Sequence, residues 1–204
     1  MLSYLDPILF PDEVKVYEIS LDRYVYPIFK NGSSSIQAMD YRQLNYTEIR
    51  NLREIDIFVR DPFERYVSGV QTYLNSMSSQ LDRFTMLNII SQYLFLNRHF
   101  TPQFFWVLNL ARFTDAWMHF LPMTDLVTAT EYTFNQLSRD TELEAYFQNH
   151  SKLEFYLQLD KAITEEFLGE TVSFRRVCEH MRNKQSYLWD EIVVRNQTLC
   201  SVLG

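Results

Sequence analysis

Residues 55–69 read IDIFVRDPFERYVSG and predict a strand that leads directly into a helix. The run from Ile55 to Val59 is rich in β-branched and aromatic residues, as a short buried strand requires. Asp61 can cap the helix, Pro62 suits its first position, and Glu64 follows the cap by three residues. The apolar residues of this helix recur at helical spacing: Phe63, Tyr66, Val67, Val70, Tyr73, Leu74 and Met77.

A similar unit precedes it at residues 24–36, which read YVYPIFKNGSSSI. Residues 24–29 predict a short buried strand, with Pro27 near its end because proline cannot donate to a strand ladder. After the polar residues 30–35, a helix is expected that carries four residues roughly on one side: Ile36, Met39, Gln43 and Leu44. Two successive strand–helix units indicate an α/β fold.

The rest of the chain predicts mostly helices. One strand is expected around Ala116–Leu121, and residues 187–194 fit a helix or a strand equally well. Helices are expected at about 81–97, 124–138, 141–149, 152–168 and 174–183. No Pro-, Gly- or Ser-rich stretch marks a boundary, so residues 1–204 are expected to form one domain. We expect a three-layer α/β fold with a small central parallel sheet flanked by helices and a helix-rich C-terminal half.

Composition narrows the possible partners and locations. The net charge of −7 and the pI near 5.1 argue against non-specific binding to nucleic acid, so an anionic ligand must be held by a few placed cations and backbone amides. The N-terminus lacks the basic region of a signal peptide, and the densest apolar stretch, residues 104–111, is far shorter than the ~20 residues of a membrane span. Cys178 and Cys200 match no metal or redox spacing and suit a reducing compartment, and a single disulfide is the alternative. The chain is therefore expected to be cytoplasmic, with no nucleic-acid partner and no membrane span.

The polar segment between the first strand and its helix has the composition of a phosphate-binding turn. Small residues allow backbone N–H groups to point at an anion, hydroxyls add hydrogen bonds, a lysine adds charge, and the following helix presents its N-terminus. The residues concerned are Lys30, Asn31, Gly32, Ser33, Ser34 and Ser35. The segment is not a Walker A loop, because its lysine precedes the glycine. A serine-rich turn with a fortuitous lysine is the alternative interpretation.

Arg60 and Ser68 extend this candidate site. Arg60 stands where the second strand ends, and Ser68 lies two turns into the following helix. Both could reach an anion above the carboxyl ends of the strands, where open α/β sheets bind ligands, and arginine suits phosphate through its bidentate fork. The alternative is that Arg60 forms a surface ion pair and Ser68 is solvated.

Together the two segments resemble the sulfotransferases that use 3′-phosphoadenosine 5′-phosphosulfate, and especially their carbohydrate branch. The resemblance covers residues 24–103 and includes a His-x-x-Pro-Gln element at His99–Gln103. It implies a P-loop-like fold in which residues 30–35 bind the 5′-phosphosulfate while Arg60 and Ser68 bind the 3′-phosphate. The glycine-rich third nucleotide segment of small-molecule members is not recognisable in this chain.

The implied activity is transfer of a sulfuryl group to an acceptor hydroxyl, of a carbohydrate or a small molecule, which leaves adenosine 3′,5′-bisphosphate and requires no metal. Lys30 would stabilise charge on the leaving phosphate. His99 is the expected general base, because imidazole has a suitable pKa and the residue follows the helix pair that begins at Arg60. No histidine lies between Lys30 and Arg60, where some carbohydrate members keep their base, and Asp40 and Glu48 are the alternatives. Two other functions are considered: a kinase-like nucleotide-dependent phosphotransferase, and an inactive nucleotide-binding relative.

Overall fold

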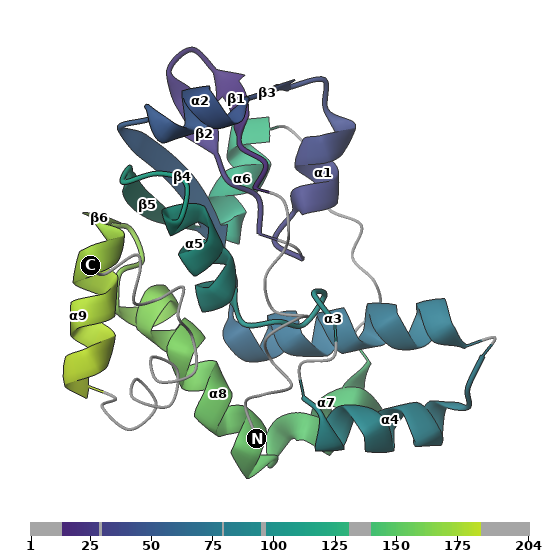
Figure 1. Ribbon diagram of the computed structural model, residues 1–204. Coiled ribbons are helices and arrows are strands. Elements are labelled where there is room, and N and C mark those ends of the chain that lie inside the picture. The colour runs from purple at the N-terminus through teal and green to yellow at the C-terminus, as the bar shows by residue number, and fades with distance from the viewer. Residues whose placement is uncertain (1–13, 29, 79, 95–96, 131–139, 185–204) are drawn as a thin grey trace.

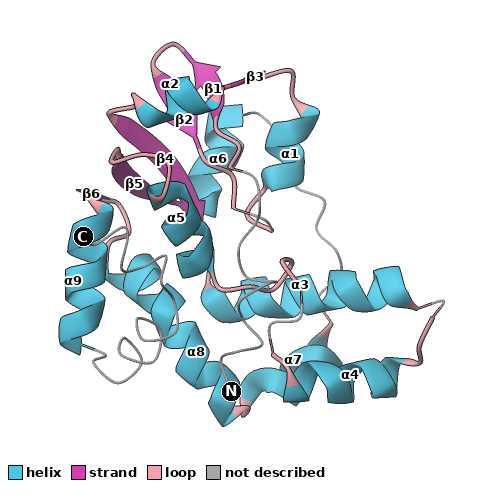
Figure 2. Ribbon diagram, in the orientation of Figure 1, coloured by secondary structure: helices cyan, strands magenta, loops and turns pink. Residues whose placement is uncertain are grey.

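A six-stranded mixed sheet in the order β3-β1-β2-β4-β5-β6 lies between helices in the computed structural model (Figures 1 and 2). The structure describes residues 14–28, 30–78, 80–94, 97–130 and 140–184. The strands are β1 (Tyr17–Ser20), β2 (Arg23–Val25), β3 (Arg42–Gln43), β4 (Glu54–Val59), β5 (Trp117–Pro122) and β6 (Thr171–Val172). The described helices are α1 (Ser33–Ala38), α2 (Tyr46–Arg50), α3 (Pro62–Met77), α4 (Arg83–Gln92), α5 (Gln103–Ala111), α6 (Met123–Thr130), α7 (Thr141–Gln148), α8 (Ser151–Lys161) and α9 (Phe174–Lys184), with a π-helical turn η2 (Ala162–Glu166) after α8.

The α/β class is confirmed, but the sheet is not parallel throughout. Strands β2, β4 and β5 are parallel, and β4 and β5 pair without interruption from Glu54 opposite Trp117 to Val59 opposite Pro122. Strands β1, β3 and β6 join this centre in antiparallel pairs. The sequence did not predict these three because each has at most four residues and carries exposed polar side chains.

The capping residues and the apolar run in the sequence predict the positions of β4 and α3 correctly. Asp61 Oδ1 accepts a hydrogen bond from the Glu64 backbone N–H at 2.8 Å, and Pro62 is the first helical residue. This cap fixes the start of α3 immediately after β4. The chain therefore turns sharply at Arg60, at the carboxyl edge of the sheet.

Several expected helices are shorter in the structure. The helix predicted to reach Leu44 ends at Ala38, because residues Arg42–Gln43 pair with β1 instead. The helix predicted to reach residue 97 ends at Gln92. The helix expected at 152–168 becomes π-helical from Ala162 and ends at Glu166. The predictions for residues 131–138 and 187–194 lie outside the described residues, as does Cys200.

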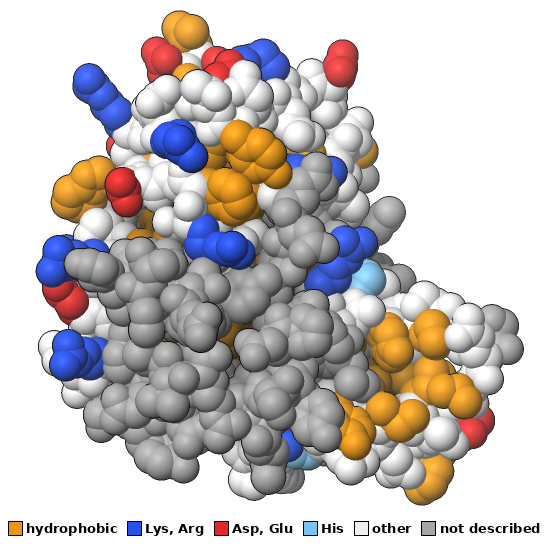
Figure 3. All heavy atoms as spheres, viewed as in Figure 1, with side chains coloured by type: hydrophobic (Ala, Val, Ile, Leu, Met, Phe, Trp, Pro, Cys, Tyr) orange, Lys and Arg blue, Asp and Glu red, His pale blue; other side chains and the backbone are white. Residues whose placement is uncertain are grey.

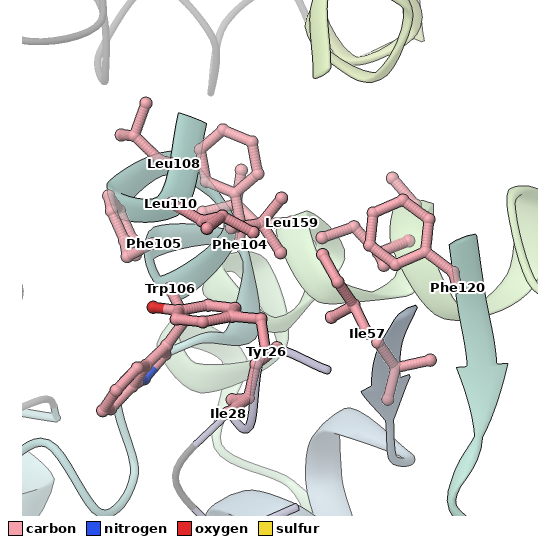
Figure 4. Packing of buried hydrophobic residues seen from close by; sticks show 14 of the residues in the cluster. Tyr26, Ile28, Ile57, Phe104, Phe105, Trp106, Leu108, Leu110, Phe120 and Leu159 are labelled. Carbon is pink, nitrogen blue, oxygen red and sulfur yellow. The ribbon is translucent and has the colours of Figure 1, made fainter. Parts of the chain in front are cut away.

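Helices cover both faces of the sheet. The smaller core contains Ile36 of α1 and Leu126 of α6, which pack with Phe58 of β4. The larger core lies on the opposite face, where Phe104 of α5 and Leu159 of α8 belong to the same cluster as residues of β4 and β5 (Figure 4). Two helical layers thus enclose the sheet.

Helix α5 is a core helix. Every residue from Gln103 to Ala111 is buried, as expected of a helix that is apolar on all sides. Its first residue, Gln103, is one of the few polar groups in this core. The start of α5 is therefore a place where polar atoms must be paired within the protein.

None of the helices in the described ranges combines the length and the apolar character that crossing a bilayer requires.

Candidate active site

The candidate phosphate loop leaves the sheet at the carboxyl end of β2 and turns tightly. The Asn31 backbone N–H donates to the Ile28 carbonyl oxygen at 2.9 Å and closes the turn. Lys30 (φ 70°) and Gly32 (φ 74°) both adopt left-handed backbone conformations. Glycine does so freely, whereas a residue such as Lys30 incurs about 1–3 kcal/mol of strain, which in proteins is concentrated at functional sites.

The Lys30 side chain reaches helix α3 at the turn that follows Ser68. Its Nζ donates to Thr72 Oγ1 at 2.7 Å, and Thr72 Oγ1 donates to the Ser68 carbonyl oxygen at 3.0 Å. Partial burial lowers the pKa of Lys30, and the neighbouring cations Arg60 and Arg65 lower it further. Three cations therefore converge here, and a bound anion would relieve their mutual repulsion.

Arg60 directly follows β4 and is partly exposed. Its Nε lies 3.7 Å from Glu64 Oε2, so the surface ion pair considered from the sequence is present. An exposed pair at this distance contributes little to stability. The Arg60 guanidinium can exchange this partner for a phosphate at small cost.

The serines of the loop differ in accessibility. Ser33 is buried and Ser34 is exposed, while the side chain of Ser35 lies outside the described atoms. Helix α1 begins at Ser33 and has only six residues, so its dipole is small. The Lys30 and Arg60 side chains are thus the principal positive charges of the loop region.

Asn31 points into the protein rather than toward solvent. It is fully buried, and its Nδ2 donates to the Phe58 carbonyl oxygen at 2.9 Å and to Gln103 Oε1 at 2.5 Å. In this arrangement its side chain joins the loop to β4 and α5. Asn31 was expected among the ligand-binding residues. In the structure its side chain instead forms hydrogen bonds with other residues of the protein.

His99 lies in the turn after α4 and is held by Asn97. Asn97 Oδ1 accepts hydrogen bonds from the His99 backbone N–H at 3.0 Å and from its Nδ1 at 2.5 Å. Because a carbonyl oxygen only accepts, the neutral ring carries its proton on Nδ1 and has its lone pair on Nε2. Burial lowers the pKa of His99 to about 4, with further contributions from Lys30, Arg98 and Arg65. His99 is therefore neutral at pH 7, in the form a general base requires.

Gly69 allows the His99 turn to pack on α3. A Cβ atom at Gly69 would lie 2.3 Å from the His99 carbonyl oxygen and 3.0 Å from Phe100 Cβ. Only a glycine permits this approach of turn to helix. A glycine in the middle of an otherwise regular amphipathic helix is the sequence signal that could have indicated such a contact.

Sequence reasoning missed two buried residues of opposite charge that influence each other. Arg65 of α3 and Asp160 of α8 are each 1% exposed. Burial lowers the pKa of Arg65 to about 10 against the opposing effect of Asp160, and burial raises the pKa of Asp160. Arg65 Nη1 also donates to the Thr101 carbonyl oxygen at 2.5 Å. Nothing in the sequence distinguishes this buried arginine from the partly exposed Arg60, five residues earlier.

Other acidic residues near the site in sequence are engaged elsewhere. Glu48 pairs with Arg42 at 2.6 Å and accepts the Asn45 backbone N–H at the start of α2. Asp56 pairs with Arg23 at 2.7 Å and with His119 at 3.2 Å. Among the residues that the structure describes, no three His, Cys, Asp or Glu side chains are grouped as a metal site requires.

Lys30 and Arg60 lie at the carboxyl edge of β2 and β4, where the charge of Arg60 acts on Lys30 and the charge of Lys30 acts on His99. Figure 3 shows Lys or Arg side chains beside a His side chain at the inward corner of the surface between α1 and the α3–α4 pair. Comparison with protein-family models, with curated protein sequences and with solved structures gave no match.

Proposed function

We propose that this protein is a sulfotransferase that moves a sulfuryl group from 3′-phosphoadenosine 5′-phosphosulfate to an acceptor hydroxyl, on a P-loop-like fold. One observation carries the proposal: the loop after β2 and the helix after β4 meet where Lys30 Nζ donates to Thr72 Oγ1 at 2.7 Å, one turn beyond Ser68, in a cluster of cations that includes Arg60. This cluster lies where parallel strands end, the usual ligand position in α/β sheets. The proposal includes a carbohydrate acceptor and the cytoplasmic location expected from the sequence.

The residues fit an anionic nucleotide donor, which would supply an activated sulfuryl group. The strained loop places Lys30 beside the Ser68 turn of α3, and the cations around it lower its pKa. Arg60 and Ser68 would hold the 3′-phosphate through charge-assisted hydrogen bonds. Lys30 would leave Thr72 and donate to the bridging oxygen, on which negative charge develops.

His99 would accept the proton of the acceptor hydroxyl at Nε2 while the hydroxyl oxygen bonds to sulfur and the bond between sulfur and the bridging oxygen breaks. Asn97 holds the ring in the tautomer that leaves Nε2 basic. In the free protein the low pKa makes His99 a weak base. An anionic ligand beside Lys30 would raise that pKa toward neutrality and strengthen the base once the donor is bound.

Calorimetry and thermal melting test the nucleotide preference. Adenosine 3′,5′-bisphosphate should bind and raise the melting temperature, and should do so more than ATP or AMP at the same ionic strength without magnesium. ATP binding that is tighter and depends on magnesium would identify a phosphotransferase instead. Release of the bisphosphate with labelled donor and a panel of glycans and small alcohols then separates an enzyme from an inactive relative.

A further inference from the structure

The carboxamide of Gln103 links the two segments of the candidate site. Its Oε1 accepts hydrogen bonds from Asn31 Nδ2 at 2.5 Å and from the Arg60 backbone N–H at 3.0 Å. Its Nε2 donates to the Arg60 carbonyl oxygen at 2.8 Å. Gln103 and Asn31 are both fully buried. One side chain thus pairs with the main chain after β4 and also holds the loop after β2.

Gln103 is itself fixed at the start of α5. The backbone N–H groups of Gln103 and Phe104 donate to the two carboxylate oxygens of Asp160, at 2.7 and 2.9 Å. Pro102 at the helix cap contributes no side-chain hydrogen bond, so Asp160 from α8 takes that role. The carboxamide therefore projects from a rigid, buried helix end.

A neutral amide suits this position for an electrostatic reason. Lys30, Arg60 and Arg65 repel one another, and that repulsion favours separation of the loop from the β4–α3 turn. An amide can bond both the N–H and the carbonyl of Arg60 without adding charge. A carboxylate in its place would neutralise the potential that an anionic ligand needs.

We propose that Gln103 is the positioning residue of the anion site, and that its carboxamide holds the Lys30 loop and the Arg60 turn in register against their repulsion. The inference rests on the proposed nucleotide site for its functional part. Its structural part, the link between the two segments, is independent of any ligand.

The variants Gln103→Met and Gln103→Glu test the proposal by their pH dependence. Methionine fills the volume but makes none of the three hydrogen bonds, and bisphosphate affinity should fall about 10-fold or more at every pH. A protonated carboxyl group can replace the amide, whereas an ionised one cannot donate to the Arg60 carbonyl and adds negative charge. Burial and the Asp160 carboxylate raise the pKa of such a group, whereas the cations Lys30, Arg60 and Arg65 lower it. Gln103→Glu should bind the bisphosphate about 10-fold or more weakly than the wild type at pH 8, where its carboxyl group is ionised, and the deficit should shrink only at a pH low enough to protonate that group.

Amide hydrogen exchange in the free protein supplies a readout that does not depend on the ligand. In Gln103→Met, the Arg60 amide loses its acceptor and the Asn31 side chain keeps only its hydrogen bond to the Phe58 carbonyl oxygen, so both backbone amides should exchange faster, the Arg60 amide about 10-fold or more. Thr114→Val is the control, because Thr114 is also buried and its Oγ1 accepts a hydrogen bond from the Ala116 backbone N–H in the turn before β5. It should leave both amides protected as in the wild type.

Different results would reject the proposed nucleotide site and the proposed role of Gln103. Failure of the wild type to bind the bisphosphate would reject the proposed nucleotide site, and exchange alone would then decide the role of Gln103. Gln103→Met with exchange and affinity within twofold of the wild type would overturn the inference, as would a Gln103→Glu affinity at pH 8 equal to that of the wild type.

Discussion

Replacement of Gly69 by alanine should destabilise the fold, although alanine favours helices. The new Cβ would lie 2.3 Å from the His99 carbonyl oxygen and 2.7 Å from its carbon, both backbone atoms. Since non-bonded heavy atoms prefer separations of roughly 3.5 Å, the turn must withdraw from α3 by about 1 Å. Overpacking of this kind lowers the free energy of unfolding by up to about 3 kcal/mol, whereas the higher helix propensity of alanine raises it by about 1 kcal/mol. The net loss of stability is about 2 kcal/mol.

Urea unfolding and thermal melting measure this loss, with an expected fall in melting temperature of about 4–8 °C for a chain of this size. A displacement of His99 by about 1 Å should also lower turnover by about 100-fold. Asn75→Ala, at an exposed position of the same helix, is the control and should alter neither quantity. A Gly69→Ala protein as stable as the wild type would refute the described packing of the His99 turn on α3.

Four further results are expected. Arg60→Ala should weaken bisphosphate binding about 10- to 100-fold by calorimetry, because a charge-assisted hydrogen bond is lost; an unchanged affinity would remove Arg60 from the site. Lys30→Ala should lower kcat about 100-fold or more with a smaller change in bisphosphate affinity, and equal losses in both would make Lys30 a binding residue only. His99→Ala should lower turnover about 10²- to 10⁴-fold with binding nearly intact, and retention of more than a tenth of kcat would direct attention to Asp40. Because the pKa of His99 is about 4 in the fold, the unfolded chain binds the proton first as pH falls from about 6.5 toward 4. Stability should therefore decrease over that window, and less steeply in His99→Ala; histidine ring NMR should find the low pKa in the free protein and a higher one with bisphosphate.

The elements predicted correctly are those whose signals lie within a few neighbouring residues. The cap at Asp61, the proline at position 62 and the apolar run of β4 act through adjacent groups, so the sequence indicates them directly. The loop at Lys30 and Gly32 was identified in the same way, from its composition. The α/β class followed from these strand–helix units.

Contacts between distant segments determine the elements that the sequence did not predict. The two-residue strands β3 and β6 exist only because β1 and β5 offer them partners, and the pairing at Arg42–Gln43 ends α1 early. Short strands have too little local pattern to be identified without their neighbours.

The candidate site also depends on both local sequence signals and contacts between distant segments. The residue types at Lys30 and Arg60 predicted an anion site and His99 a general base, but the positions of these residues depend on the approach of α3 to the His99 turn at Gly69 and on the link made by Gln103. Whether an asparagine or arginine faces solvent or the interior is determined by the segments that pack on it, because burial changes the free energy of a polar group by more than any local preference. Side-chain chemistry could therefore be assigned from the sequence, whereas the burial of Asn31 and Arg65 and the pKa of His99 were determined only by tertiary packing.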